Sequence, residues 1–120
     1  MYGTIARMRV KPDMVNQLLD WMRQEDTRGM LGYKTSYTYQ MDAEPTTMFV
    51  AIVFESREAY VANAQSPQMD ARYHELLALL EESPEWHDGQ IIYPQGWVSS
   101  RRVAHSRDAL SYHFVWVVGV

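Results

Sequence analysis

Two neighbouring residues, Tyr73 and His74, carry side chains suited to acid–base chemistry. Tyr73 belongs to an apolar stripe at helical spacing, so its ring should face the sheet. That stripe consists of Met69, Tyr73, Leu76, Leu77 and Leu80. His74 is turned about 100° round the same helix, where an imidazole could act as a base near neutral pH or ligate haem iron. The alternatives are a core tyrosine with a satisfied hydroxyl and a partly exposed histidine on the helix flank.

Trp86 and His87 form a second candidate pair, just before the expected last strand. An aromatic ring beside a histidine at a pocket mouth could stack on a planar ligand, although a tryptophan after a Ser-Pro turn is more often a packing lid. His74, His87 and Asp88 do not have the spacing of a metal site. We therefore expect no bound metal.

Arg7 lies on the less apolar face of the expected first strand, as does Arg9. If that face meets another subunit, an arginine there should pair with an acidic residue or contact an anionic ligand, and we prefer the salt bridge. The tyrosines of the expected second strand, Tyr33, Tyr37 and Tyr39, should share one face of that strand and are typical of a sheet core. Their number also suits a pocket for a flat aromatic molecule.

Composition restricts the class of protein. The chain has 120 residues, of which 47% are apolar and 22% charged, which is ordinary for one soluble domain. A net charge of −4 argues against nucleic acid or an anionic membrane as the main partner. The absence of cysteine excludes disulfides, a thiol nucleophile and Cys-based metal sites. With no signal peptide and no apolar run approaching the ~20 residues that span a bilayer, we expect a cytoplasmic protein.

Hydrophobic periodicity predicts six elements in the order β-α-β-β-α-β. The expected strands are 2–10, 33–41, 48–54 and 89–93. The first helix follows Lys11-Pro12-Asp13 and ends at Gly29 and Gly32. The second helical region begins at Ser56 and is interrupted at Ser66-Pro67. This order is typical of an α+β, ferredoxin-like fold with a four-stranded antiparallel sheet. Both helical regions then cover the same face of the sheet.

The strand at 48–54 bears directly on assembly, because it has no polar face. Met48, Val50, Ile52 and Phe54 line one side, and Phe49, Ala51 and Val53 line the other. Only one side can be covered by the chain's own helices. We therefore expect a homodimer whose second sheet covers the other side, with coverage by the C-terminal segment as the alternative.

We place the domain at residues 1–93 and treat residues 94–120 as a C-terminal extension. Its segment 112–120 (YHFVWVVGV) has strong β propensity. It could add a strand to a sheet edge, even in a partner subunit, or form a poorly ordered extension. Both readings stay open.

Four segments of residues 1–93 resemble the antibiotic biosynthesis monooxygenase family of dimeric α+β barrels. They are YGTIARMRVKP, VFESREAYVANAQSP, YHELLALLEESPEW and DGQIIY. The resemblance implies a pocket between the sheet and its helices. It also implies oxygenases that need no metal or flavin, because an electron-rich phenol or hydroquinone itself reduces dioxygen.

The same resemblance suggests working residues. Quinone-forming relatives use an Asn and a Tyr around this helix, and Asn63 and Tyr73 match them in spacing. Those relatives place a Trp between the two, whereas this chain has Gln65-Ser66-Pro67 there. Haem-degrading relatives carry an Asn on the first strand plus a Trp and a His on this helix. Here the first strand has no Asn and the helix has no Trp, so haem degradation is disfavoured. For Asn63 the alternative is a helix C-cap.

These observations lead to two functional hypotheses. The first is a cofactor-independent monooxygenase that oxidises a phenolic or quinol molecule with O2. Asn63, Tyr73 and His74 would do the chemistry, while Trp21 and Trp86 would shape the pocket. The second is a non-enzymatic dimeric barrel that binds a small aromatic ligand. A module whose C-terminal strand joins other partners is a third possibility.

Overall fold

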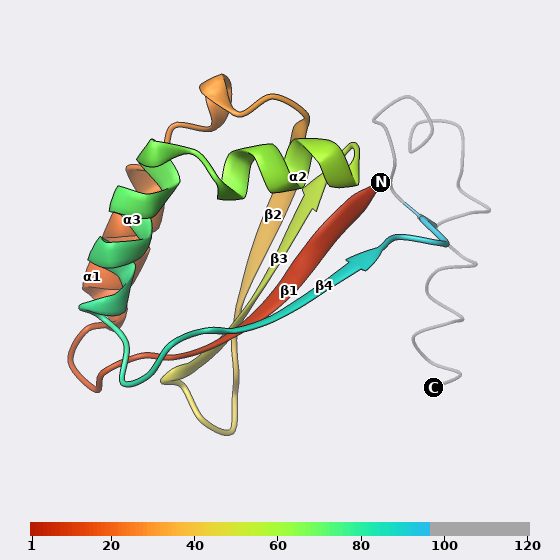
Figure 1. Cartoon of the computed structure of the whole chain (residues 1–120). Helices are drawn as coiled ribbons and strands as arrows, with labels where there is room; N and C mark the ends of the chain where they lie inside the picture. Colours follow the sequence, from red (N-terminus) through yellow and green to blue (C-terminus); the bar gives the residue numbers. More distant parts are fainter. Residues whose placement is uncertain (97–120) are drawn as a thin grey trace, which may run out of the picture.

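A computed structural model describes residues 1–96 (Figure 1). Its elements are β1 (Tyr2–Arg9), α1 (Val15–Arg23), a 3-10 turn (Thr27–Gly29), β2 (Tyr33–Gln40), β3 (Thr47–Phe54), α2 (Arg57–Ala64), α3 (Pro67–Leu77) and β4 (Glu85–Gln90). The strands form one antiparallel sheet in the order β2-β3-β1-β4. This confirms the α+β, ferredoxin-like prediction. The segment 112–120, where an added strand was considered, lies outside the described residues.

The core forms where the two central strands meet the helices. In the pairing of β1 with β3, Ala6 lies opposite Val50 and Met8 opposite Met48, and all four side chains are buried. Leu18 of α1 and Leu76 of α3 pack against these side chains from the helix side of the sheet. Burying these apolar side chains is the main favourable term in the folding of the domain.

Serine caps determine where the second and third helices begin. Ser56 Oγ accepts a hydrogen bond from the Ala59 N–H at the start of α2, and Ser66 Oγ accepts one from Met69 at the start of α3. Pro67 occupies the first turn of α3, where its missing N–H costs nothing. The predicted interruption at Ser66-Pro67 is therefore confirmed. It lets α3 lie beside α1, while α2 begins near the start of β1 and runs away from it toward α3 (Figure 1).

The opposite face of the sheet, called the open face below, is not covered by any helix among residues 1–96. The second apolar side of β3 lies here, with Phe49, Ala51 and Val53 all partly exposed. Ile5 of β1 is 53% exposed beside them. The prediction that β3 is apolar on both sides is confirmed.

Two predicted boundaries differ clearly from the structure. The first helix ends at Arg23 rather than at Gly29, because Asp26 caps a separate 3-10 turn through the Arg28 N–H. The last strand begins at Glu85 rather than Gly89, because Glu85 already pairs with Arg7 of β1 and the pairing continues to Gln90 opposite Tyr2.

A bulge also divides the tyrosines of β2. The register shifts between Tyr33 and Thr35, so Tyr33 turns to the helix side and packs edge-on against Phe54. Tyr37 and Tyr39 stay on the open face. The expectation that all three tyrosines share one face was wrong, because a bulge inserts one extra residue and breaks the alternation of side chains.

None of the helices formed by residues 1–96 is long and apolar enough to cross a membrane.

The paired glycines of β1 and β4 generate a test of packing in the sheet. A Cβ at Gly3 would lie 2.0 Å from the Ile52 carbonyl oxygen, whereas a Cβ at Gly89, directly opposite, would meet nothing within 4 Å. Gly3→Ala should therefore lower the free energy of unfolding by about 1–3 kcal/mol in urea titrations. Gly89→Ala is the matched control and should be neutral or slightly stabilising. Equal effects of the two substitutions would contradict the close approach.

Candidate functional site

Tyr73 and Asn63, the two residues suggested for chemistry, both lie on the helix side of the sheet. Tyr73 is partly buried and packs against the core, as its place on the apolar stripe predicts. Asn63 is partly buried in the last turn of α2. The cap of α2 is Gln65, so the C-cap alternative for Asn63 was wrong. Within residues 1–96 no hydrogen bond joins Asn63 to Tyr73, so any common action would run through a ligand.

His74 points away from this region, although it follows Tyr73 in the chain. Its side chain is 71% exposed, and Nδ1 lies 2.8 Å from the Asp70 carbonyl oxygen. That carbonyl can only accept, so Nδ1 carries the proton and Nε2 faces solvent. This is the flank position considered as the alternative. A ligand held between helix and sheet would not reach this ring without a rearrangement.

Trp21 lies between α1 and α3 in a compact polar cluster. Its indole N–H donates to Glu75 Oε2 at 2.9 Å, and the Arg72 guanidinium stacks 3.8 Å above its ring. Arg72 also pairs with Glu25, and both of these side chains are mostly buried. The charge pair and the cation–π contact hold the two helices together. Trp21 therefore has a packing role in addition to any part in shaping a pocket.

Trp86 and Asp88 lie on the helix side of β4, the edge strand of the sheet. Trp86 stands opposite Ala6 of β1 and is 41% exposed, so its ring is accessible from the edge. Asp88 Oδ1 accepts a 2.7 Å hydrogen bond from the hydroxyl of Tyr60 in α2. Burial of the phenol and this hydrogen bond raise the pKa of Tyr60 to about 12. At neutral pH the Tyr60 hydroxyl is therefore a permanent donor.

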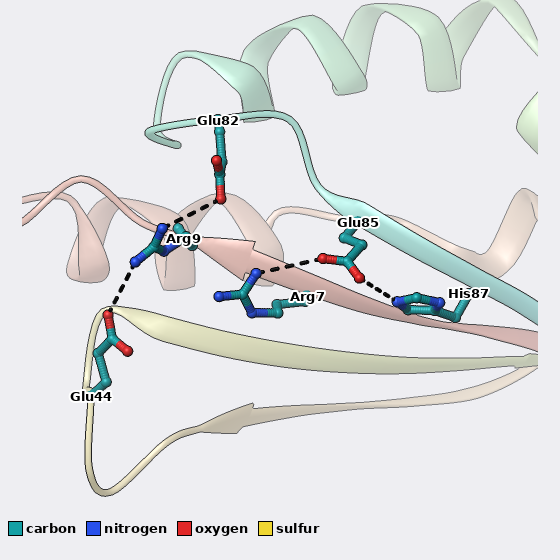
Figure 2. A network of polar contacts seen from close by, with 6 residues as sticks. All are labelled: Arg7, Arg9, Glu44, Glu82, Glu85 and His87. Carbon is teal, nitrogen blue, oxygen red and sulfur yellow. Dashed lines mark hydrogen bonds and ion pairs between the residues drawn. The ribbon is translucent and has the colours of Figure 1, made fainter.

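The remaining predicted residues lie on the open face, on the other side of the sheet from Tyr73. Figure 2 shows Arg7 with Glu85, and Glu85 in turn with His87. The Arg7 guanidinium lies 3.5 Å from Glu85 Oε2, and His87 Nε2 lies 2.9 Å from Glu85 Oε1. The preferred interpretation of Arg7 as a salt-bridge residue agrees with this contact. Tyr37, on β2, faces the same side.

Arg9 forms a second set of ion pairs on the same face (Figure 2). It reaches Glu44 at 3.6 Å and Glu82 at 3.7 Å. Between these charged groups and the edge of β2 lies an apolar hollow of about 320 Å³, lined by Ile5, Tyr39, Met41, Phe49 and Ala51. The charges of this face are thus paired within the chain, while its apolar part is exposed.

The structure brings Tyr60, Asp88 and Thr4 together on the helix side. Sequence reasoning did not single out Tyr60 or Thr4, and it considered Asp88 only as a metal ligand. Tyr60 precedes Asn63 by three residues, so both fall on one face of α2. Asp88 faces Thr4 only because of the register between β1 and β4. The alternation of β4 could have indicated that Asp88 and Trp86 share a side. The missing information was the true start of that strand.

No cluster of three or more His, Asp or Glu side chains within residues 1–96 could hold a metal ion.

The raised pKa of Tyr60 predicts a loss of stability in alkali. The ordinary pKa is near 10, so the unfolded chain releases this proton at lower pH than the folded protein. The stabilisation is complete below pH 10 and is lost as the pH rises from about 10 to 12. In urea titrations, wild type should lose more unfolding free energy between pH 9 and 11 than Tyr60→Phe does. Between pH 7 and 9 the two should change in parallel, and parallel behaviour up to pH 11 would contradict the shift.

Comparison with known structures supports the fold. The structure resembles a Nitrosomonas europaea protein provisionally assigned as an antibiotic biosynthesis monooxygenase, with a TM-score of 0.67, 18% identity, and coverage of 78% of this chain and 100% of the other. A conserved protein from Methanosarcina mazei gives a TM-score of 0.67 at 16% identity, covering 74% and 90%. Rv0793 from Mycobacterium tuberculosis gives 0.63 at 19% identity, covering 82% and 98%. At these identities the likeness shows the fold alone.

A search among curated proteins finds no significant match. The sequence model of one family, antibiotic biosynthesis monooxygenase (ABM), matches residues 1–75. The match runs from β1 into α3, and it includes Asn63, Tyr73 and His74. It covers more than half of the chain, as the resemblance of the strand and helix segments led us to expect. The chain therefore belongs to the antibiotic biosynthesis monooxygenase family.

Proposed function

We propose that the protein is a cofactor-independent monooxygenase that oxidises a phenolic or quinol molecule with O2. The observation that carries this proposal is the position of Tyr73, which lies inside the family match and packs toward the sheet from α3. Asn63 of α2 lies partly buried on the same side of the sheet. Together they offer an amide and a phenol to an aromatic substrate, with Trp86 accessible at the edge.

The chemistry follows from the substrate. An anthrone or hydroquinone loses a proton to give an electron-rich anion, and this anion passes electrons to O2. With an anthrone, one oxygen atom becomes the new carbonyl and the other leaves as water, so no outside reductant is consumed. The protein has to hold the anion with hydrogen-bond donors and keep water away from the reacting carbon. The Tyr73 hydroxyl and the Asn63 amide are suited to the first task.

One observation favours the second candidate, a non-enzymatic protein that binds a small aromatic ligand. His74 faces solvent, so the helix side of the sheet lacks a histidine base among residues 1–96. Because a phenol is more acidic than water, a substrate phenol could still lose its proton without a histidine base, in a site whose hydrogen-bond donors stabilise the phenolate. Oxygen consumption therefore separates the two candidates.

The open face supports a further part of the proposal, a homodimer formed by two sheets. Ile5, Phe49 and Ala51 present apolar surface around the 320 Å³ hollow. The charged side chains of that face are already paired within one chain, as Arg7 is with Glu85. A second copy of the sheet would bury the apolar part without leaving these charges unpaired.

The enzyme proposal is tested by oxygen uptake with a panel of anthrone and hydroquinone compounds. We expect uptake above the uncatalysed rate with at least one compound, and Tyr73→Phe should reduce turnover about 100-fold. The thermal midpoint should change little, because within residues 1–96 the Tyr73 hydroxyl makes no hydrogen bond. Tyr93→Phe, at an exposed position, is the control. A compound that binds tightly while uptake stays at the uncatalysed rate would favour the binding protein.

The dimer proposal is tested by replacing an apolar side chain of the open face with a charged one. Ile5→Glu should raise the dissociation constant of the dimer at least about 100-fold, because each interface would bury two unpaired carboxylates. Analytical ultracentrifugation of the full chain measures this. Leu31→Glu is the control, since Leu31 is 87% exposed and lies outside the sheet. A wild-type monomer, or an Ile5→Glu dimer of unchanged affinity, would overturn the proposal.

A further inference from the structure

An arginine of α3, Arg72, contacts α1 and the residues just after it through several groups at once. Its guanidinium donates to the Trp21 carbonyl oxygen at 2.9 Å and stacks 3.8 Å above the indole ring of the same residue. It also pairs with the carboxylate of Glu25, which follows α1. Glu75, one turn further along α3, accepts from the Trp21 indole N–H at 2.9 Å and lies 3.6 Å from Arg72. These four residues are called the Arg72 cluster below.

The Arg72 cluster supplies the directional contacts between α1 and α3. Within residues 1–96, every hydrogen bond that joins a residue of α1 to a residue of α3 involves Arg72 or Glu75. Leu18 and Leu76 pack in the shared core, but such apolar contacts are non-directional. They resist separation of the helices better than rotation of one against the other. The planar guanidinium, by contrast, fixes angles as well as distances.

The charges of this cluster are a poor means of stabilising the domain. The side chains of Arg72 and Glu25 are only 19% and 21% exposed, so both charges lose most of their hydration. Nε of Arg72 is fully shielded from solvent and has no hydrogen-bond partner within residues 1–96. Well-packed apolar side chains in place of a buried ion pair often keep or raise stability. A role in fixing geometry therefore explains the cluster better than a role in stability.

Tyr73, the residue proposed to act on the substrate, comes directly after Arg72 in α3. It is turned about 100° round the helix and packs against the core, on which Trp21 packs from α1. A tyrosine hydroxyl stands well away from the helix axis, so rotating α3 by about 10° moves it by more than about 1 Å. A misplacement of about 1 Å can lower an enzymatic rate on the order of 100-fold. The angle at which α3 lies against α1 therefore matters for a reaction that uses this hydroxyl.

We propose that Arg72 is a positioning residue, which sets the rotation of α3 and thereby holds the Tyr73 hydroxyl in place for the substrate. Trp21 and Glu25 form the fixed side of this contact, and Glu75 adds a second link from α3 to α1. This role rests on the monooxygenase function proposed above. It goes beyond that function, because it assigns a part in the reaction to a residue that acts only through another.

The main test compares kinetics with stability in a double variant, Arg72→Met with Glu25→Leu, which removes both charges of the buried pair. We expect kcat for oxygen uptake to fall about 10- to 100-fold, with KM changed less than about 3-fold, because Tyr73 acts mainly in the transition state. The free energy of unfolding, from urea titrations, should stay equal or rise. Wild-type kcat in this variant, or a kcat that falls only in step with stability, would overturn the proposal.

A second variant, Arg72→Lys, separates geometry from charge. Lysine keeps a positive charge beside Glu25, but its single ammonium lacks the planar fork that reaches several partners at once. We expect kcat to stay reduced, whereas full recovery would show that charge alone matters and would also overturn the proposal. Arg23→Met with Asp20→Leu is the matched control, because this pair lies within α1 with side chains 71% and 67% exposed. Its kinetic constants should equal those of wild type.

A readout that needs no activity keeps failure of this role distinct from failure of the enzyme proposal. In NMR spectra of the full chain, nuclear Overhauser contacts report where the Tyr73 ring lies against the core, and the Tyr73→Phe spectrum assigns its signals. These contacts should change in the Arg72 and Glu25 double variant and persist in the control. If they change while wild type takes up no oxygen, the enzyme proposal fails and the positioning of Tyr73 by Arg72 stands. If they do not change, the positioning role is overturned, whatever the oxygen uptake of wild type.

Discussion

The pairing of β1 with β3 places Ala6 opposite Val50 and Met8 opposite Met48, and these side chains form the layer on which the helices pack. Because side chains alternate along a strand, the same pairing sends the residues between them to the other side. Apolar surface consequently lies on both sides of the sheet, while the helices of residues 1–96 cover one. In the proposed function, the helix side takes part in ligand chemistry and the open face in assembly.

Polar groups are distributed differently on the two sides. On the open face, Arg7 pairs with Glu85 and Arg9 pairs with Glu44, so charges neutralise one another within one chain. On the helix side, the Asp88 carboxylate accepts a hydrogen bond from Tyr60, and Thr4, opposite Asp88, is buried. Charges that are already paired lose less on burial against another sheet than unpaired charges do.

The candidate site was only partly predictable, and the reason differs between residues. The sheet-facing position of Tyr73 follows from helical spacing, which is a local property. Trp86 and His87 were expected before the last strand, yet both lie within β4 and point to opposite sides. Their separation depends on where β4 begins, which is decided by the length of β1 beside it. The role of Asp88 depends on the same long-range register.

The sequence by itself determined the order of the elements, the break at Ser66-Pro67 and the two apolar sides of β3. Each of these depends on near neighbours in the chain: spacing, capping hydroxyls and a proline. Only the tertiary structure decided the bulge that divides Tyr33 from Tyr37, the early start of β4 and the meeting of Thr4, Tyr60 and Asp88. These depend on register between strands and on how α2 lies over them, and contacts between segments far apart in the chain leave no periodic pattern in either segment.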